Sequence, residues 1–165
     1  MPFPSDEERW MRAALQQAQA AQEAGEEPVG AVLVEAATGR IVARAHSQRA
    51  ALNDPTAHAT MLVLSQLAQF AQMKAEIEAA GLPHALPDGE PAAVGLEGFV
   101  LVLTREPCLM CAGAVRLYPE IRKLVFGARR ATLGGAGSDV NLFGAAIPIR
   151  GGVLAAECER LKDKI

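Results

Sequence analysis

Two apolar runs in the second half of the chain place the strongest constraint on its fold. They are "FVLVLT", residues 99–104, and "KLVFGA", residues 123–128. A half-exposed strand alternates apolar and polar residues, whereas a continuous apolar run is typical of a buried parallel strand with both faces covered. Between the two runs, the segment from Cys108 to Leu117 predicts a helix. Pro107 suits the first turn of this helix, and Pro119 ends it.

The first part of the chain predicts a helix followed by a hairpin. Ser5, as N-cap, and Glu8 form a capping box, and apolar residues then recur at helical spacing until Gly25 ends the helix. Residues 32–34 and 41–43 predict two short apolar strands with a turn between them.

The remaining segments complete the predicted order of elements. Thr56 is the expected N-cap of a second helix, which carries His58. Residues 66–98 begin with a helical composition and become rich in Pro and Gly, which predicts a long insertion or loop. Residues 151–165 predict a short final helix. For a chain of 165 residues, this order predicts one domain over residues 1–165. The predicted class is α/β, with three α-β-α layers and a mixed central sheet.

Composition narrows the class of partner. No apolar run reaches the ~18 residues of a membrane span, and the acidic start "MPFPSDEERW" does not resemble a signal peptide. We therefore expect a cytoplasmic protein without membrane contact. The net charge of -3 lacks the basic excess of a dedicated nucleic-acid-binding domain. A local run of basic residues is compatible with a nucleic-acid-binding patch, but solvated surface is the favoured interpretation; the run comprises Arg116, Arg122, Lys123, Arg129 and Arg130.

His58, Cys108 and Cys111 are the candidate metal ligands. Cys108 and Cys111 are one helical turn apart, and the start of their helix favours thiolate over thiol. If the helix that carries His58 packs beside it on the sheet, three donors converge. One His and two Cys leave a fourth position open, which is typical of a catalytic zinc site. Taken alone, the Cys pair is also compatible with a redox pair or with two buried thiols. Cys158 is expected to be buried.

Five stretches of the chain carry a family resemblance. They are "EEPVGAVLV", "DPTAHA", "EPCLMCAGAV", "KLVFGAR" and "GVLAAEC", in this order. They resemble the cytidine/deoxycytidylate deaminase superfamily, whose zinc signature is His-x-Glu followed by Pro-Cys-x-x-Cys. Within that superfamily the chain is most similar to bacterial tRNA-adenosine deaminases and to the small guanine and cytosine deaminases.

The resemblance implies a site and a reaction. It implies that zinc is held by the three candidate ligands, and that Val29, Gly30, Ala31 and the backbone near Pro107 line a base pocket. It implies a homodimer whose contact face includes the last helix and the sheet edge. It also implies hydrolytic deamination of a nucleobase or nucleoside, with tRNA adenosine among the candidates: water replaces the amine on a ring carbon, and ammonia leaves.

Three features depart from the family pattern. Thr60 stands where the family has its catalytic Glu, and we interpret it as natural divergence rather than as an introduced change. Ser47 stands where the family usually has a base- or sugar-binding Asn, and Asn53 is the nearest Asn. Residues 66–98 are longer than the family norm.

Thr60 is expected to impair the reaction. A carboxylate carries protons to the ring and to the departing amine, whereas a threonine hydroxyl has no accessible pKa for this. Loss of a general acid–base typically costs ~10²–10⁴-fold. Glu26, Glu27 and Glu106 flank the pocket motifs but are expected to point outward.

Three hypotheses follow for the function. The first is a zinc-dependent deaminase, a hydrolase, that is impaired at Thr60. The second is a catalytically inactive homologue that acts as a binding or partner subunit. The third is an α/β domain whose Cys pair is not metallated.

Overall fold

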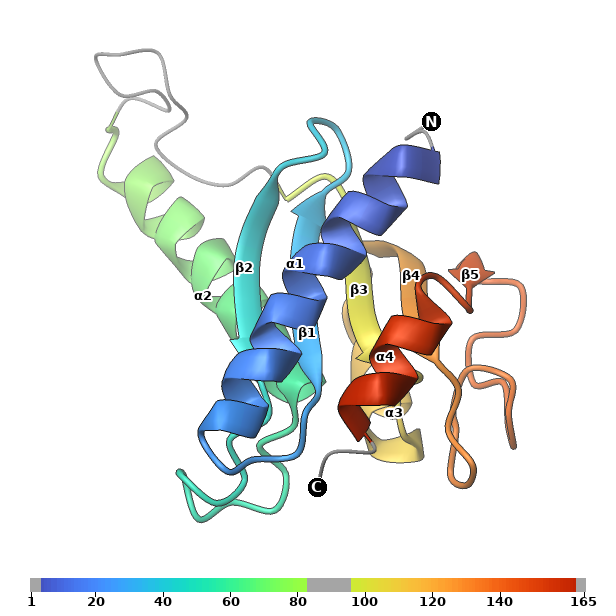
Figure 1. Ribbon diagram of the computed structural model, residues 1–165. Coiled ribbons are helices and arrows are strands. Elements are labelled where there is room, and N and C mark those ends of the chain that lie inside the picture. The colour runs from blue at the N-terminus through green and yellow to red at the C-terminus, as the bar shows by residue number, and fades with distance from the viewer. Residues whose placement is uncertain (1–3, 83–95, 163–165) are drawn as a thin grey trace.

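The fold was analysed in a computed structural model that describes residues 4–82 and 96–162. The described residues form one sheet with the strand order β2-β1-β3-β4-β5 (Figure 1). The strands are β1 Gly30–Glu35, β2 Ile41–His46, β3 Phe99–Arg105, β4 Ile121–Ala128 and β5 Ile149–Arg150. The helices are α1 Pro4–Glu23, α2 Ala59–Ala79, α3 Leu109–Val115 and α4 Ala155–Lys162.

The helices cover both faces of the sheet, which confirms the predicted α/β fold with α-β-α layers. Helices α1 and α4 lie on the near face in Figure 1, and α2 and α3 lie on the far face. Alternate residues of β3 point to the two sides. Leu101 and Leu103 join the core beneath α2 and α3, whereas Val100 and Val102 join the core beneath α1. This two-sided burial explains the continuous apolar run. In the described residues, no helix is long and apolar enough to cross a membrane.

The directions of the strands determine where the site lies. Strand β1 is antiparallel to both of its neighbours, β2 and β3, so β2 and β3 run in the same direction. Strand β3 is also parallel to β4, which makes the sheet mixed as predicted. Helix α2 follows β2 and helix α3 follows β3. Both helices therefore begin at the same edge of the sheet.

Several predicted boundaries are corrected by the structure. Helix α1 begins at Pro4, so Ser5 lies inside the helix and is not its N-cap. Proline is favoured in a first turn because its missing N–H is not needed there. Helix α2 has His58 as its N-cap in place of Thr56. The Thr56 amide and hydroxyl both donate to Asp54 Oδ1, at 2.8 and 2.7 Å, so they form a local turn before the helix.

The ends of two helices also differ from expectation. Helix α3 spans seven residues and ends at Val115, two residues before the predicted end. Helix α2 continues to Ala79, in agreement with the helical composition after residue 66. The Pro/Gly-rich part of the predicted loop, residues 83–95, lies outside the described residues. Strand β5 was not predicted, because a strand of two residues carries no periodic signal.

Gly30, the first residue of β1, allows α1 to pack closely on the sheet. A Cβ atom at this position would lie 2.0 Å from the Ala14 carbonyl oxygen and 2.6 Å from the Ala18 nitrogen. Both contacts are with helix backbone, so no side-chain rotation relieves them. The Gly30 amide also donates to Thr104 Oγ1 at 3.0 Å, which links β1 to β3.

We predict that Gly30→Ala destabilises the fold by about 1–3 kcal/mol, because the added methyl forces α1 away from the sheet. Gly113→Ala in α3 is the matched control, since a Cβ there would meet nothing within 4 Å. Alanine is also the better helix former, so the control is expected to be neutral or stabilising by about 0.5–1 kcal/mol. Equilibrium urea unfolding of both variants checks this, and equal midpoints for the two would contradict it.

Candidate metal centre

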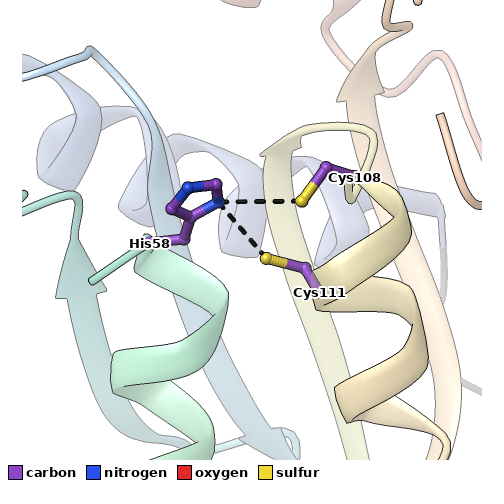
Figure 2. A group of neighbouring side chains, drawn as sticks. All are labelled: His58, Cys108 and Cys111. Atoms are coloured by element: carbon purple, nitrogen blue, oxygen red, sulfur yellow. Dashed lines mark hydrogen bonds between the residues drawn. The ribbon is translucent and has the colours of Figure 1, made fainter. Parts of the chain in front are cut away.

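His58, Cys108 and Cys111 converge at one point, as their sequence pattern predicted. The Nδ1 atom of His58 lies 3.7 Å from Cys108 Sγ and 3.5 Å from Cys111 Sγ (Figure 2). All three ligand atoms lie within 4.8 Å of one another. One imidazole nitrogen and two thiols at this separation match the donor set that zinc prefers. The residues present therefore fit a metal ion.

Two of these three ligands occupy the N-cap positions of their helices. His58 caps α2 and Cys108 caps α3, and neither side chain makes a capping hydrogen bond. An N-cap residue has extended backbone angles and normally turns a side-chain oxygen back to the first amides of the helix. Here both side chains are free to point toward each other. Cys111 lies one turn further along α3 and completes the group.

The thiols of Cys108 and Cys111 have opposite pKa shifts. A hydrogen bond from Cys111 is the main cause that lowers the pKa of Cys108 to about 5. The same hydrogen bond, together with burial, raises the pKa of Cys111. Metals bind the thiolate form. The site therefore offers one thiolate at neutral pH, and metal binding displaces the proton from the second thiol.

Thr60 lies in the first turn of α2 and contacts the metal ligands. Its residue is 4% exposed. Its side chain hydrogen-bonds Cys111 and favours the thiolate of that residue, although the pKa of Cys111 is raised overall. The residue at the position of the family's Glu therefore faces the donor group, but it brings a hydroxyl and no carboxylate.

A small cavity adjoins the metal ligands. Its volume is about 20 Å³, which is room for about one water molecule. It is lined by Glu27, Val29, Ser47, His58, Ala59, Thr60, Arg105, Glu106, Pro107, Cys108, Cys111 and Arg130. Ser47 is 2% exposed, and its hydroxyl has no hydrogen-bond partner among the described residues.

The predicted substrate-binding residues separate into two groups. Val29, Ser47 and Pro107 line the cavity. Gly30 and Ala31 are not among its lining residues. Gly30 lies against α1, and Ala31 is fully buried in the core on the α2 side of the sheet. Val29, directly before β1, thus lines the cavity, while the first two residues of β1 pack the fold.

The three flanking carboxylates do not simply point outward, which corrects the expectation. Glu106 is 1% exposed and accepts hydrogen bonds from the amides of Arg130, Ala136 and Ser138 at 2.9–3.1 Å, and from the Ser138 hydroxyl. Although burial raises its pKa, these donors hold the pKa of Glu106 below its ordinary value. Its carboxylate therefore anchors the glycine-rich loop after β4.

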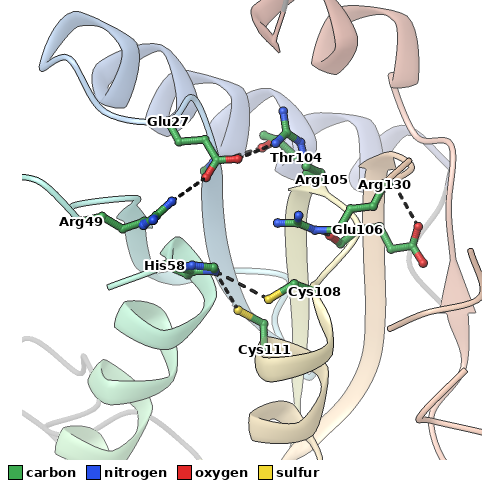
Figure 3. Close-up of polar contacts among 10 residues, drawn as sticks. Glu27, Arg49, His58, Thr104, Arg105, Glu106, Cys108, Cys111 and Arg130 are labelled. Atoms are coloured by element: carbon green, nitrogen blue, oxygen red, sulfur yellow. Dashed lines mark hydrogen bonds and ion pairs between the residues drawn. The ribbon is translucent and has the colours of Figure 1, made fainter. Parts of the chain in front are cut away.

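Glu26 and Glu27 behave differently from each other. Glu26 accepts the amides of Ala51 and Ala50 at 2.7 and 3.1 Å, and the Ala51 bond is the main cause that lowers its pKa. Glu27 lines the cavity and pairs with Arg105 at 2.6 Å (Figure 3).

Sequence reasoning missed the two arginines that line the cavity. Arg105 is the last residue of β3, directly before the Glu-Pro-Cys motif, and its position at a strand end was the available signal. Arg130 was interpreted as part of a solvated basic run. Its Nε donates to the Glu106 carbonyl oxygen at 2.9 Å, so it lies against the site. Lys123 of the same run pairs with the buried Glu7 at 2.5 Å.

Comparison with known proteins agrees with this geometry. The family model described as "Cytidine and deoxycytidylate deaminase zinc-binding region" matches residues 4–128. The tRNA-specific adenosine deaminase of Bacillus subtilis is 36% identical over 162 residues, which covers 93% of this chain and 84% of that protein. The tRNA-specific adenosine deaminase 2 of Xenopus laevis is 33% identical over 144 residues, 87% of this chain and 73% of that protein.

Solved structures resemble the fold over nearly its whole length. A structure from studies of A-to-I editing by tRNA:A34 deaminases has a TM-score of 0.66 and 33% identity, and the match covers 93% of this chain and 98% of that one. A guanine deaminase from Nitrosomonas europaea has a TM-score of 0.67 and 29% identity, and covers 94% and 82%. The chain therefore belongs to the cytidine and deoxycytidylate deaminase family, with His58, Cys108 and Cys111 positioned to bind its metal ion.

Proposed function

We propose that the protein holds zinc at His58, Cys108 and Cys111, recognises a nucleobase or nucleoside beside it, and deaminates it only slowly. The observation that carries this proposal is Thr60. Its hydroxyl faces a metal ligand in the cavity, at the sequence position where the family signature has a carboxylate.

The proton balance explains the proposed impairment. Zinc bound at such a site supplies a water that is activated near neutral pH. The reaction also needs a group that takes a proton and returns one to the departing amine. Thr60 donates or accepts a hydrogen bond but does not hold the proton. Glu106 is committed to the loop after β4, and Glu27 is paired with Arg105. Neither is free to take over the role.

The class of ligand follows from the relatives. Curated relatives are tRNA-specific adenosine deaminases, and a solved neighbour is a guanine deaminase. We propose a purine or cytosine base, as a free base, a nucleoside or part of a tRNA. The hydroxyl of Ser47 and the backbone at Val29 and Pro107 are the proposed contacts, since all three residues line the cavity.

The second candidate function is a non-catalytic one. The same zinc-holding fold would then bind a nucleobase or serve as a partner subunit without turnover. The small volume of the cavity, about 20 Å³, favours the partner-subunit form of this alternative, because no base enters the cavity without movement of the lining side chains. In either case a cytoplasmic location is part of the proposal, since a Cys pair kept for metal suits a reducing compartment.

Ammonia release tests the role of Thr60. We predict that Thr60→Glu raises turnover at least about 10²-fold over the unmodified protein, because it restores the proton carrier. The panel comprises adenine, guanine and cytosine, their nucleosides, and a tRNA anticodon stem-loop. Thr60→Gln is the matched control, since it has nearly the shape of Glu and no titratable group, and it is expected to stay at the level of the unmodified protein.

Two results would count against this account. Turnover by the unmodified protein at ordinary enzyme rates, about 1–10³ s⁻¹, would show that Thr60 does not impair the reaction. Absence of turnover in zinc-loaded Thr60→Glu on the whole panel would favour the non-catalytic candidate.

We also propose a homodimer. Three exposed apolar side chains lie on α3, in the turn after it and in the loop that follows β4, namely Met110, Leu117 and Leu133. We propose that this face contributes to the contact, in addition to the last helix and the sheet edge that the family resemblance implies. Leu117→Glu is expected to shift the protein from dimer to monomer in sedimentation velocity, because it buries a charge in the contact. A monomeric unmodified protein at all concentrations would contradict the proposal.

A further inference from the structure

Glu27 stands between two hollows of different size. The inner one is the cavity of about 20 Å³ at the metal ligands. The outer one has a volume of about 420 Å³ and is lined by Gly25, Glu26, Glu27, Arg49, Ala50, Asn53, Asp54 and Pro55. The outer hollow is wide, shallow and open to solvent, whereas the inner one has room for about one water molecule. Glu27 is the residue that the linings of the two hollows share.

The Glu27 carboxylate is held in this position by arginine. Its Oε1 accepts from Arg105 Nη1 at 2.6 Å, and the Arg105 side chain is 13% exposed. Its Oε2 lies 3.9 Å from Arg49 Nη1, on the solvent side (Figure 3). The Arg105 pair is charge-assisted and partly shielded from water, so it is the stronger of the two. The Arg49 contact is long and exposed and contributes little.

Arg105 has no other carboxylate in the cavity to balance it. Glu106 is the second acid that lines the cavity, and its oxygens accept the amides of Ala136 and Ser138 and the Ser138 hydroxyl. Arg130 adds another positive charge at the wall. Without Glu27, the guanidinium of Arg105 would lose its carboxylate partner, because the Glu106 carboxylate is bound to the loop after β4. A partly buried guanidinium of this kind selects an anionic partner, and phosphate suits its planar fork as well as carboxylate does.

Ser47 provides an independent sign of a polar ligand in the same place. Its hydroxyl is buried, lines the inner cavity and has no hydrogen-bond partner among the described residues. Buried polar groups are nearly always paired, so an unpaired one that lines a cavity marks a group that a ligand or water satisfies. Ser47 thus supplies a contact for a polar group of the ligand, and Arg105 supplies a contact for an anionic group.

We propose that Glu27 is a built-in substitute for an anionic group of the ligand. In the structure it occupies Arg105 and closes the inner cavity. A ligand that carries a phosphate next to its nucleoside displaces the Glu27 carboxylate, takes its place on Arg105, and opens the way to the metal ligands. Arg49, on the rim of the outer hollow, receives the released carboxylate, so Glu27 stays ion-paired. This inference rests on the proposed function, because it names the anionic part of the ligand of the same site.

Two consequences separate this arrangement from a simple surface ion pair. Phosphate-bearing nucleosides bind better than the same nucleosides without phosphate, and this preference falls as salt rises, since both partners are charged. Removal of the Glu27 charge strengthens the preference, because the internal competitor is lost. Removal of the Arg105 charge abolishes it.

Calorimetric titration of the zinc-loaded protein tests these consequences. Adenosine, guanosine and cytidine are compared with their 5′-monophosphates, and the measured quantity is the ratio of the two affinities for each base. We expect Glu27→Gln to raise this ratio by about tenfold, which is the size of one charge-assisted hydrogen bond. We expect Arg105→Gln to bring the ratio close to one, and Arg105→Lys to keep part of it.

Control variants isolate the charge at this position. Glu76→Gln removes a carboxylate from the exposed side of α2, where Glu76 accepts a hydrogen bond from Gln72 at 2.9 Å. Arg12→Gln removes a guanidinium from α1 that pairs with Glu157 at 3.4 Å. Neither is expected to change the ratio. Zinc content and circular dichroism of every variant confirm that the fold and the metal site are retained.

The possible outcomes lead to distinct conclusions. If nucleosides bind and the ratio is the same in the unmodified protein, Glu27→Gln and Arg105→Gln, this inference is wrong and the proposed function stands. If no nucleoside, nucleotide or tRNA anticodon stem-loop binds to zinc-loaded protein, both are wrong. A tRNA anticodon stem-loop is titrated in parallel. If Glu27→Gln raises the affinity for the stem-loop alone, the phosphate belongs to an RNA strand. If it raises the affinity for the monophosphates, the ligand is a free nucleotide.

Discussion

The directions of three neighbouring strands determine the position of the site. Because β1 is antiparallel to both β2 and β3, the strands on either side of it run in the same direction. The helices that follow β2 and β3 then start at one edge of the sheet and pack on one face. His58 and Cys108 lie at those two starts, so chain segments fifty residues apart meet without a long loop. The loops that carry Glu27, Ser47 and Arg130 leave or enter the sheet at the same edge, which gives the metal ligands their surroundings.

Helices α2 and α3 lack the stabilisation of a side-chain N-cap. A Ser, Thr, Asp or Asn at an N-cap stabilises a helix by about 0.5–2 kcal/mol relative to a residue that makes no capping bond. His58 and Cys108 make none. The cost is offset by packing, because Ala59, Val63 and Leu64 of α2 and Ala112 and Val115 of α3 are buried in the shared core. The fold thus holds its donor atoms in place through buried apolar contacts and leaves the donors themselves available to a metal ion.

The sequence was sufficient for features that have a periodic or a chemical signature. The runs around Leu101 and Val125 predicted buried strands, and the pattern of His58, Cys108 and Cys111 predicted a zinc site with its residues. The sequence was not sufficient for contacts between side chains that are far apart along the chain. The Glu27–Arg105 pair joins residues far apart in sequence, and the orientation of Glu106 depends on loop amides that no local pattern reveals. Thr56 was predicted as an N-cap, but its amide and hydroxyl donate to Asp54, and His58 is the N-cap.

X-ray absorption at the zinc edge of the purified protein tests the central claim, that His58, Cys108 and Cys111 together bind zinc. The account predicts one zinc per chain, with two sulfur neighbours at about 2.3 Å and one imidazole nitrogen at about 2.0–2.1 Å. In Cys111→Ser the sulfur contribution falls by half. Two results would contradict the claim that these three residues form a metal centre. One is protein that retains no zinc after expression in zinc-supplemented medium and purification. The other is bound zinc with no sulfur neighbours.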